Sequence, residues 1–203
     1  MSKPSDKKLS GLLYPIHDAY LARFEAFLRD LRGKVRRFVV DPELRGSGGA
    51  LGTITRQDVM ARTHYGSVKA FAIDSDQRID FPPARFKEGG LEVGVAPFLW
   101  ESMELWADGQ ADAVSRALAL WFNTAATPVG STGHETIQGV THFISDPVSE
   151  RGLTTCVIDL GTAPVEAVIS LLGFLQLAGA SRVDLGQLQM DESPTGELRR
   201  LTS

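Results

Sequence analysis

Several β-type runs of the sequence end in an aspartate, a residue that can help to hold a divalent cation. These aspartates are Asp41, Asp74, Asp146 and Asp159, with Asp184 in the last such run. If the runs formed parallel strands, the carboxylates would collect along one edge of a sheet, where Mg²⁺ could be held for phosphoryl transfer. The alternative is turn chemistry, because Asp41 and Asp146 both precede proline. Short connections between the runs favour antiparallel pairing, which places the aspartates at opposite edges, so we predict no metal site.

The second candidate is the glycine-rich stretch "DPELRGSGGALG", residues 41–52, which follows the apolar run "RFVV". Glycine lets backbone N–H groups approach a pyrophosphate, and the N-terminus of a following helix favours an anion. The stretch resembles the acyl-coenzyme A loop of the GCN5-related N-acetyltransferases, with Arg45, Gly46, Gly48 and Ala50 at the motif positions. The resemblance implies that Arg45, Gly46, Gly48 and Gly49 contact a phosphate-bearing cofactor. The alternative is a surface loop in which glycine supplies positive φ, and on that interpretation the protein uses no cofactor.

The histidines form no recognisable catalytic or metal-binding pair. They are His17, His64, His134 and His142, and no two stand four residues apart, as two zinc ligands on one helix would. Ser131, Thr132 and His134 lie in the longest connection and could supply a nucleophile and a base. No orienting acid accompanies them, and a disordered loop is the alternative. We therefore predict no catalytic residue.

A cluster of basic residues spans the end of the first expected helix and the first expected strand. Arg29, Arg32, Lys34, Arg36 and Arg37 fall within nine residues. Such a cluster can contact a polyanion, but no aromatic side chain is interleaved with it, as stacking on bases requires. The alternative is a solvated helix end and strand face. The formal net charge of −4 also weighs against a whole-surface attraction to nucleic acid or anionic lipid.

The composition is that of a folded protein of ordinary domain size. The chain has 203 residues, of which 43% are hydrophobic and 23% are charged, and such a chain can bury one substantial core. Its single cysteine, Cys156, argues against a disulfide framework and against a cysteine-based zinc site. The N-terminus lacks the apolar stretch of a secretory signal, so we expect a cytoplasmic protein without membrane contact.

Three main helices are expected from apolar residues at helical spacing. They cover residues 16–31, 110–122 and 164–180. Pro15 is expected in the first turn of the first helix, where proline is tolerated, and a further short helix is expected over residues 56–62. The third main helix is apolar nearly all round, which indicates burial in the core or at a subunit interface.

The remaining apolar runs predict short strands separated by proline and glycine. "TTCVIDL", the third main helix and "SRVDLGQL" are expected to form a βαβ unit with parallel strands. The predicted class is α+β, with a mixed, mostly antiparallel sheet, about three main helices and one C-terminal βαβ unit. A single domain is expected over residues 11–190, with flexible tails at residues 1–10 and 191–203.

The alternation in "WESMELW" predicts a partly exposed strand face that could meet a protein partner. Trp100 and Trp106 are expected on one face of this strand and Met103 on the other. Together with Arg36 and Arg37, these three residues are the predicted interaction surface.

The leading hypothesis is a non-catalytic protein that binds another protein, such as a subunit, an adaptor or an immunity-type protein of a bacterial system. It rests on the lack of a pattern that combines nucleophile, base and orienting acid, and a homo-oligomer stays open. The first alternative is an enzyme or small-ligand-binding protein that uses residues 45–52 for a phosphate-bearing cofactor, as an acetyltransferase would. The second alternative is contact with nucleic acid through residues 29–37.

Overall fold

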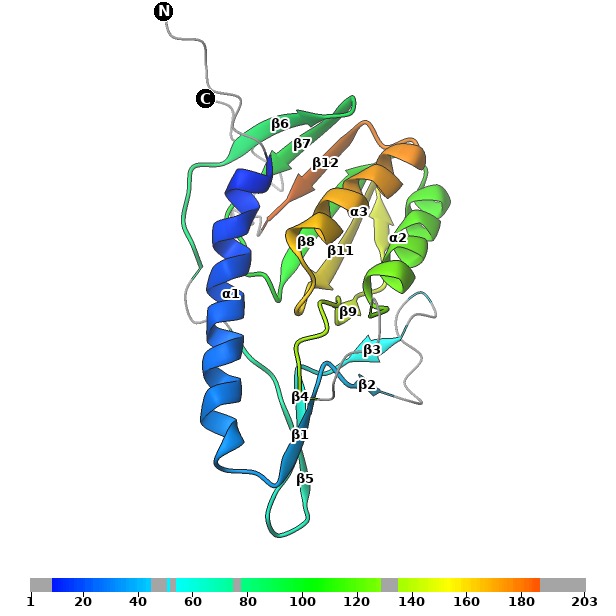
Figure 1. Ribbon diagram of the computed structural model, residues 1–203. Helices are drawn as coiled ribbons and strands as arrows, with labels where there is room; N and C mark the ends of the chain where they lie inside the picture. Colours follow the sequence, from blue (N-terminus) through cyan, green and yellow to red (C-terminus); the bar gives the residue numbers. More distant parts are fainter. Residues whose placement is uncertain (1–8, 45–50, 52–53, 75–77, 129–134, 187–203) are drawn as a thin grey trace, which may run out of the picture.

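The computed structural model shows an α+β fold, as the sequence predicts (Figure 1), and it describes residues 9–44, 51, 54–74, 78–128 and 135–186. The helices are α1 (Leu9–Arg32), α2 (Ala111–Ala125) and α3 (Val165–Leu177). The strands are β1 (Arg37–Val40), β2 (Glu43–Leu44), β3 (Thr55–Arg56), β4 (Val59–Arg62), β5 (Val68–Phe71), β6 (Ala84–Glu88), β7 (Leu91–Val95), β8 (Met103–Asp108), β9 (Phe143–Ile144), β10 (Val148–Glu150), β11 (Leu153–Asp159) and β12 (Arg182–Leu185). They form one seven-stranded, one three-stranded and one two-stranded sheet.

The seven-stranded sheet is mixed and mostly antiparallel. Its order is β10, β11, β8, β12, β7 and β6, and β9 also pairs with β11. The parallel pair among its described strands is β7 with β12. β11 and β12 also run in the same direction, but β8 lies between them and is antiparallel to both. The predicted βαβ unit is therefore present in a split form, in which an antiparallel strand separates its two parallel strands.

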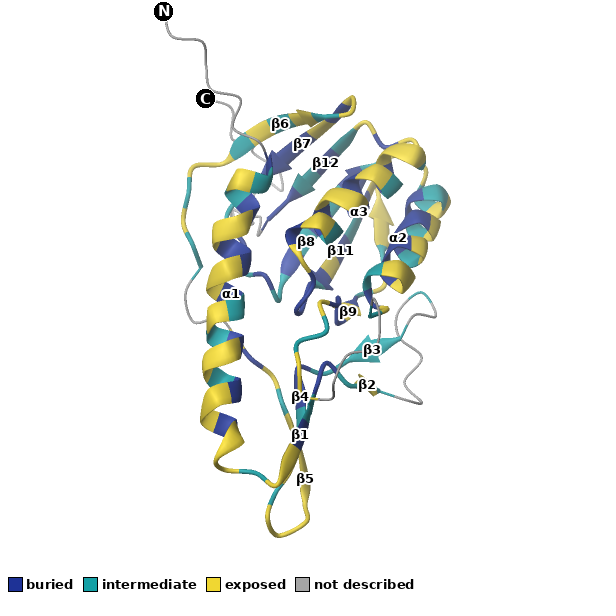
Figure 2. Cartoon of the chain, in the orientation of Figure 1, coloured by how far each residue is buried: buried dark blue, intermediate teal, exposed yellow. Residues whose placement is uncertain are grey.

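Helices α2 and α3 cover one face of this sheet (Figure 1). On β8, every second residue from Met103 is buried, whereas Trp106 and its alternates are half-buried (Figure 2). α3 packs against α2, where the Trp121 indole N–H donates to the Ala167 carbonyl at 2.9 Å. Within the described residues, no helix combines the length and the apolar character needed to cross a bilayer.

Helix α1 starts earlier than the sequence predicts. It begins at Leu9, inside the segment predicted as a tail, and Pro15 lies in its interior rather than in its first turn. Proline inside a helix costs about 3 kcal/mol, because it removes one hydrogen bond and crowds the preceding turn. Leu9 and Leu13 are fully buried, and each such side chain contributes about 1.5–3 kcal/mol, which offsets that cost.

A three-stranded sheet of β1, β4 and β5 extends from the main sheet toward the C-terminal end of α1 (Figure 1). Residues 59–62 form β4, so the short helix predicted over residues 56–62 is wrong. Val59 and Ala61 are buried and alternate with less buried neighbours, which is the period of a strand. The Phe27 and Phe71 ring centroids lie 5.4 Å apart and pack this sheet against α1.

The residue directly after β12, Gly186, occupies a position that requires glycine. Its φ is +142°, and a Cβ atom there would lie 2.7 Å from the Ala96 carbonyl oxygen. We expect Gly186→Ala to lower the free energy of unfolding by about 1–3 kcal/mol, measured by urea denaturation. The matched control is Gly173→Ala in α3, where a Cβ atom meets nothing within 4 Å and alanine adds about 1 kcal/mol of helix propensity. A Gly186→Ala protein as stable as wild type would contradict the crowding.

Candidate functional site

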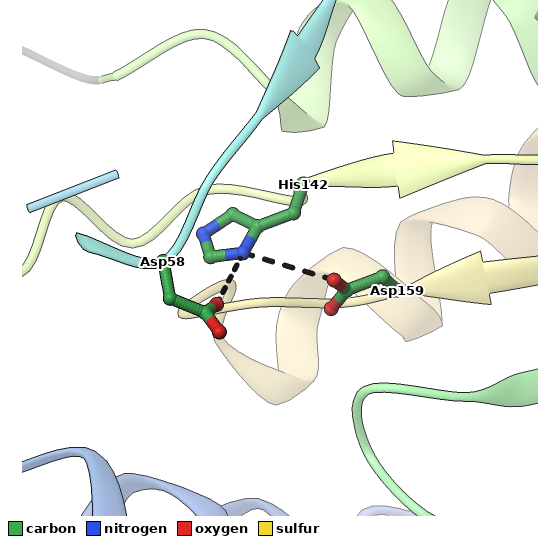
Figure 3. A group of neighbouring side chains, drawn as sticks. All are labelled: Asp58, His142 and Asp159. Atoms are coloured by element: carbon green, nitrogen blue, oxygen red, sulfur yellow. Dashed lines mark ion pairs between the residues drawn. The ribbon is translucent and has the colours of Figure 1, made fainter. Parts of the chain in front are cut away.

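A buried group of titratable side chains surrounds His142, in the segment before β9 (Figure 3). The imidazole is 1% exposed, and the carboxylates of Asp41, Asp58 and Asp159 lie around it. Nε2 lies 2.8 Å from Asp41 Oδ1. Nδ1 lies 2.8 Å from Asp58 Oδ1 and 3.9 Å from Asp159 Oδ2. We call these four residues the His142 cluster.

Backbone pairing brings the four residues of the His142 cluster together. Asp41 and Asp58 continue the β1–β4 ladder, since the Asp41 N–H donates to the Asp58 carbonyl at 2.9 Å. His142 continues the β9–β11 ladder, since its N–H donates to the Asp159 carbonyl at 3.0 Å. The Arg56 N–H donates to the His142 carbonyl at 2.9 Å and joins the two ladders. The cluster therefore lies where the three-stranded sheet meets the seven-stranded sheet.

Asp41 is the fully buried carboxylate of the cluster. Its Oδ2 accepts hydrogen bonds from the Gln138 N–H and the Thr162 hydroxyl, both at 2.8 Å. Its carbonyl oxygen accepts from Arg56 Nη1 at 2.6 Å. Its φ of +51° is a left-handed value that aspartate adopts more readily than most residues. Because both carboxylate oxygens are engaged, Asp41 fixes the orientation of the imidazole it contacts.

Asp58 and Asp159 lie on the Nδ1 side of the imidazole. Asp58 Oδ2 accepts the Ile73 N–H at 2.5 Å, and its Oδ1 accepts the Tyr20 hydroxyl at 3.2 Å. Asp159 Oδ1 accepts the Gly161 N–H at 2.8 Å. The side chain of Asp159 is 29% exposed, whereas that of Asp58 is 9% exposed. Solvent therefore reaches the cluster through Asp159.

The imidazole of His142 packs directly against backbone at Gly161. A Cβ atom there would lie 2.3 Å from the ring, and the φ of Gly161 is +52°. The Gly161 carbonyl accepts the Trp100 indole N–H at 3.1 Å. A side chain at position 161 would displace the imidazole, so this glycine is part of the site.

The carboxylates favour the protonated form of His142. Burial lowers the pKa of His142, but the contacts with Asp41 and Asp58 and the charge of Asp159 outweigh it and raise the pKa to about 10. Burial raises the pKa of Asp159 to about 6, although the imidazolium opposes this shift. Three carboxylates thus face one histidine, with the Arg56 guanidinium at the Asp41 carbonyl as a second cation. The junction is rich in negative charge.

The His142 cluster has the donor atoms of a metal centre rather than of a nucleophilic enzyme. Nδ1 of His142 and one oxygen each of Asp58 and Asp159 lie within 4.8 Å of one another. Imidazole nitrogen and carboxylate oxygen are both ligands of divalent metals. The Thr162 hydroxyl donates to Asp41, and burial raises the pKa of the Cys156 thiol to about 12. Neither group is activated as a nucleophile.

The fold brings together two of the five aspartates that follow β-type runs. Asp41 and Asp159 meet at His142. Asp74 is exposed, Asp146 accepts the Leu51 N–H at 3.4 Å, and Asp184 pairs with Arg182 at 2.7 Å outside the cluster. Asp58 and His142 were missed, because Asp58 falls in the segment predicted as a short helix and His142 has no second histidine at ligand spacing.

The interaction surface predicted around "WESMELW" stays a prediction, but the fold buries two of its residues. Trp100 is 1% exposed and Met103 is fully buried. Trp100 precedes β8 and supports Gly161, while Met103 faces the core side of the sheet. Trp106 lies on the other face, half-buried beside a groove of about 250 Å³ that Val148 and Val157 also line. Of the three residues, Trp106 alone is accessible to a partner.

Arg36 and Arg37 are exposed at the start of β1, where the fold adds further cationic groups to them. The Arg36 N–H donates to the Arg62 carbonyl at 2.9 Å, and Arg37 is the cross-strand partner of Arg62. Lys69 lies on the adjoining strand, β5. We call residues 29–37 and 62–69, the end of α1 with the start of β1 and the β4–β5 hairpin, the basic arm.

The basic arm carries more positive charge than nearby carboxylates neutralise. Its cationic residues are Arg29, Arg32, Lys34, Arg36, Arg37, Arg62 and Lys69. Lys34 pairs with Asp30 at 2.6 Å, and Arg29 lies 3.9 Å from Glu25. Within the described residues, no carboxylate pairs with Arg32, Arg36, Arg37 or Lys69. Tyr65, at the tip of the hairpin, is 100% exposed.

The predicted cofactor-binding residues, Arg45, Gly46, Gly48 and Gly49, lie outside the described residues, so their role stays a prediction. Comparison with protein-family models, with curated proteins and with solved structures found no match. The activity of the protein therefore has to be inferred from the His142 cluster and the basic arm.

The raised pKa of His142 makes the stability of the protein depend on pH. The folded protein holds the His142 proton up to about pH 10, whereas an unfolded histidine releases it near 6.5. This contribution is therefore complete below about pH 6.5 and is lost as the pH rises toward 10. We expect His142→Gln to lower the melting temperature by several degrees at the acidic end of this range and by less at the alkaline end.

Thermal melts of wild type and His142→Gln in EDTA-containing buffers measure this difference. The buried Cys156 thiol titrates in both proteins, so its effect cancels in the comparison. A difference in melting temperature that stays constant from pH 6.5 to 10 would contradict a charged His142.

Proposed function

We propose that the protein binds double-stranded DNA through the basic arm. The observation that supports this most is the gathering of cationic side chains from α1, β1, β4 and β5 at one end of a chain whose formal net charge is −4. Attraction between phosphates and clustered Lys and Arg supplies most of the sequence-independent affinity for DNA. A protein that is acidic overall and basic at one end presents that end to a polyanion.

The basic arm contains like charges that a bound phosphate would relieve. Arg37 and Arg62 lie directly opposite each other across the β1–β4 pair, and like charges in that arrangement are destabilising. Arg36 lies next to this pair, hydrogen-bonded through its backbone to Arg62. A phosphate group between these guanidinium groups would form charge-assisted hydrogen bonds and remove the repulsion.

The hairpin of the basic arm also has the shape of a groove-binding element. The major groove of B-DNA is roughly 12 Å wide and admits a two-stranded β-ribbon. β1 pairs with β4 along its whole length, so the part that could enter a groove is the turn between β4 and β5, where residues 64–70 are all exposed (Figure 2). Tyr65 at the tip supplies an aromatic ring, which residues 29–37 lack in their exposed positions. The sequence cluster at residues 29–37 has no aromatic side chain, but the fold places the exposed ring of Tyr65 in the same basic arm.

The protein-binding role expected from the sequence stays a prediction. Burial of Trp100 and Met103 removes two of its proposed contact residues. Arg36 and Arg37, the other exposed members of that predicted surface, belong to the basic arm and suit a phosphate-bearing partner better.

Binding to DNA is expected to depend steeply on salt. About four unpaired cations of the basic arm can reach phosphates, so log Kd should rise with log salt concentration with a slope of roughly 3–4. Fluorescence anisotropy of a short labelled duplex over a series of NaCl concentrations measures this slope. Affinity that does not change with salt, or no binding at low salt, would contradict the proposal.

Neutralising the basic arm is expected to weaken binding selectively. We expect Arg36→Gln combined with Arg37→Gln to raise Kd at least tenfold at low salt and to reduce the salt slope by about 2. The matched control is Arg85→Gln combined with Lys87→Gln on β6, at the opposite end of the fold (Figure 1). An equal loss in both double variants would reflect net charge alone and would exclude the basic arm as the contact surface.

A further inference from the structure

Nδ1 of His142 is a buried nitrogen without a hydrogen-bond partner in the described part of the chain. Asp58 Oδ1 lies 2.8 Å away as an ion-pair partner, but this contact does not satisfy Nδ1 as a hydrogen bond. Buried polar atoms are nearly always paired, so an exception calls for an explanation, and a bound ion or water is one. His142 is 1% exposed, so bulk water does not satisfy this nitrogen.

The contact on the other side of the ring prepares Nδ1 to act as a metal ligand. Nε2 lies 2.8 Å from Asp41 Oδ1, which accepts the Nε2 proton. Histidines that bind metals through one nitrogen usually donate the other N–H to a carboxylate or carbonyl, which fixes the tautomer and the ring orientation. Asp41 is itself held by the Thr162 hydroxyl and the Gln138 N–H. A metal ion that displaces the Nδ1 proton would therefore meet a lone pair directed between Asp58 and Asp159.

The two carboxylates on the Nδ1 side are also oriented by the backbone. The Ile73 N–H holds Asp58 Oδ2 and the Gly161 N–H holds Asp159 Oδ1. The remaining oxygen of each, Asp58 Oδ1 and Asp159 Oδ2, faces Nδ1 at 2.8 and 3.9 Å. Three donor atoms from three segments of the chain thus converge within 4.8 Å of one another (Figure 3).

We propose that Nδ1 of His142 and the carboxylates of Asp58 and Asp159 bind one divalent first-row transition-metal ion, such as Zn²⁺ or Mn²⁺. Bonds of roughly 2.0–2.2 Å in tetrahedral geometry place ligand atoms roughly 3.3 Å apart, between the 2.8 and 3.9 Å observed here. Small movements of two carboxylates therefore suffice to admit the ion. The inference does not depend on DNA binding.

The donor set selects the class of metal. Ca²⁺ takes six to eight oxygen ligands and Mg²⁺ keeps several waters in an octahedral shell. An imidazole nitrogen with two carboxylate oxygens suits Zn²⁺, Mn²⁺ or Fe²⁺ better. With three protein ligands, a four-coordinate ion keeps one position for water, and the 29% exposure of the Asp159 side chain provides the way in.

A direct binding experiment tests this site. The full chain, treated with EDTA and then desalted, is titrated with ZnCl₂ by calorimetry, with CaCl₂ as the comparison. We expect one Zn²⁺ per chain and no matching binding of Ca²⁺. Titration with CoCl₂ adds a spectroscopic readout, because four- or five-coordinate Co²⁺ absorbs far more strongly in the visible range than octahedral aqueous Co²⁺.

Two single variants locate the bound ion. Asp159→Asn keeps an oxygen to accept the Gly161 N–H but removes the ligand charge at a partly exposed position, so the fold should be retained, which circular dichroism checks. We expect at least tenfold weaker Zn²⁺ binding in Asp159→Asn and unchanged binding in His64→Gln, which alters an exposed histidine outside the cluster. No Zn²⁺ binding by wild type, equal affinity in Asp159→Asn, or a loss in His64→Gln would each overturn the proposal.

Discussion

The need for positive charge between the carboxylates at His142 is the constraint on which the junction of the two sheets depends. Asp41 and Asp58 stand opposite each other where the β1–β4 ladder continues into the interior, and two carboxylates in that position repel each other. His142 lies between them, within 2.8 Å of both. Removing one partner from such a group leaves an uncompensated buried charge, which costs far more than the intact group contributes. The junction therefore forms as a unit, with its cation in place.

Much of the surrounding polar structure serves this junction. The Tyr20 hydroxyl reaches from α1 to Asp58, the Thr162 hydroxyl reaches from the segment before α3 to Asp41, and the Trp100 indole holds Gly161 against the imidazole. These contacts join residues that are 38, 121 and 61 positions apart in the chain, so they can form only when α1, both sheets and the start of α3 are already close. They therefore add to the specificity of the fold, since no local rearrangement satisfies the same groups.

The sequence patterns predict the elements better than the places where they meet. The period of the apolar residues is a local property, which is why α2, α3 and the alternation in β8 follow from it. Over residues 56–62 the sequence predicts a helix, because seven residues are too few to distinguish a helical period from the period of a strand. The pairing of β4 with β1 makes this segment a strand. Asp41 and Asp159 are candidates in the sequence because parallel strands would bring them to one edge of a sheet. In the structure they meet for another reason, since the Arg56 N–H joins the β1–β4 ladder to the β9–β11 ladder. Nothing local marks Asp58 or His142, since their role exists only across that joint.

The three-stranded sheet connects the two sites described here. Along β1, Arg37 and Asp41 are four residues apart, roughly 13 Å at the rise of a strand. One end of the β1–β4 pair is thus fixed by the buried His142 cluster, and the other end projects into solvent with the cationic groups of the basic arm. The rings of Phe27 and Phe71 hold the sheet against α1 close to the buried end. A short sheet of this kind has little core of its own, so its orientation depends both on packing against α1 and on the contacts at its base. At the buried end His142 and Arg56 face the carboxylates, whereas at the exposed end four cations have no carboxylate partner among the described residues, and that difference is the physical basis for proposing a polyanion as the partner.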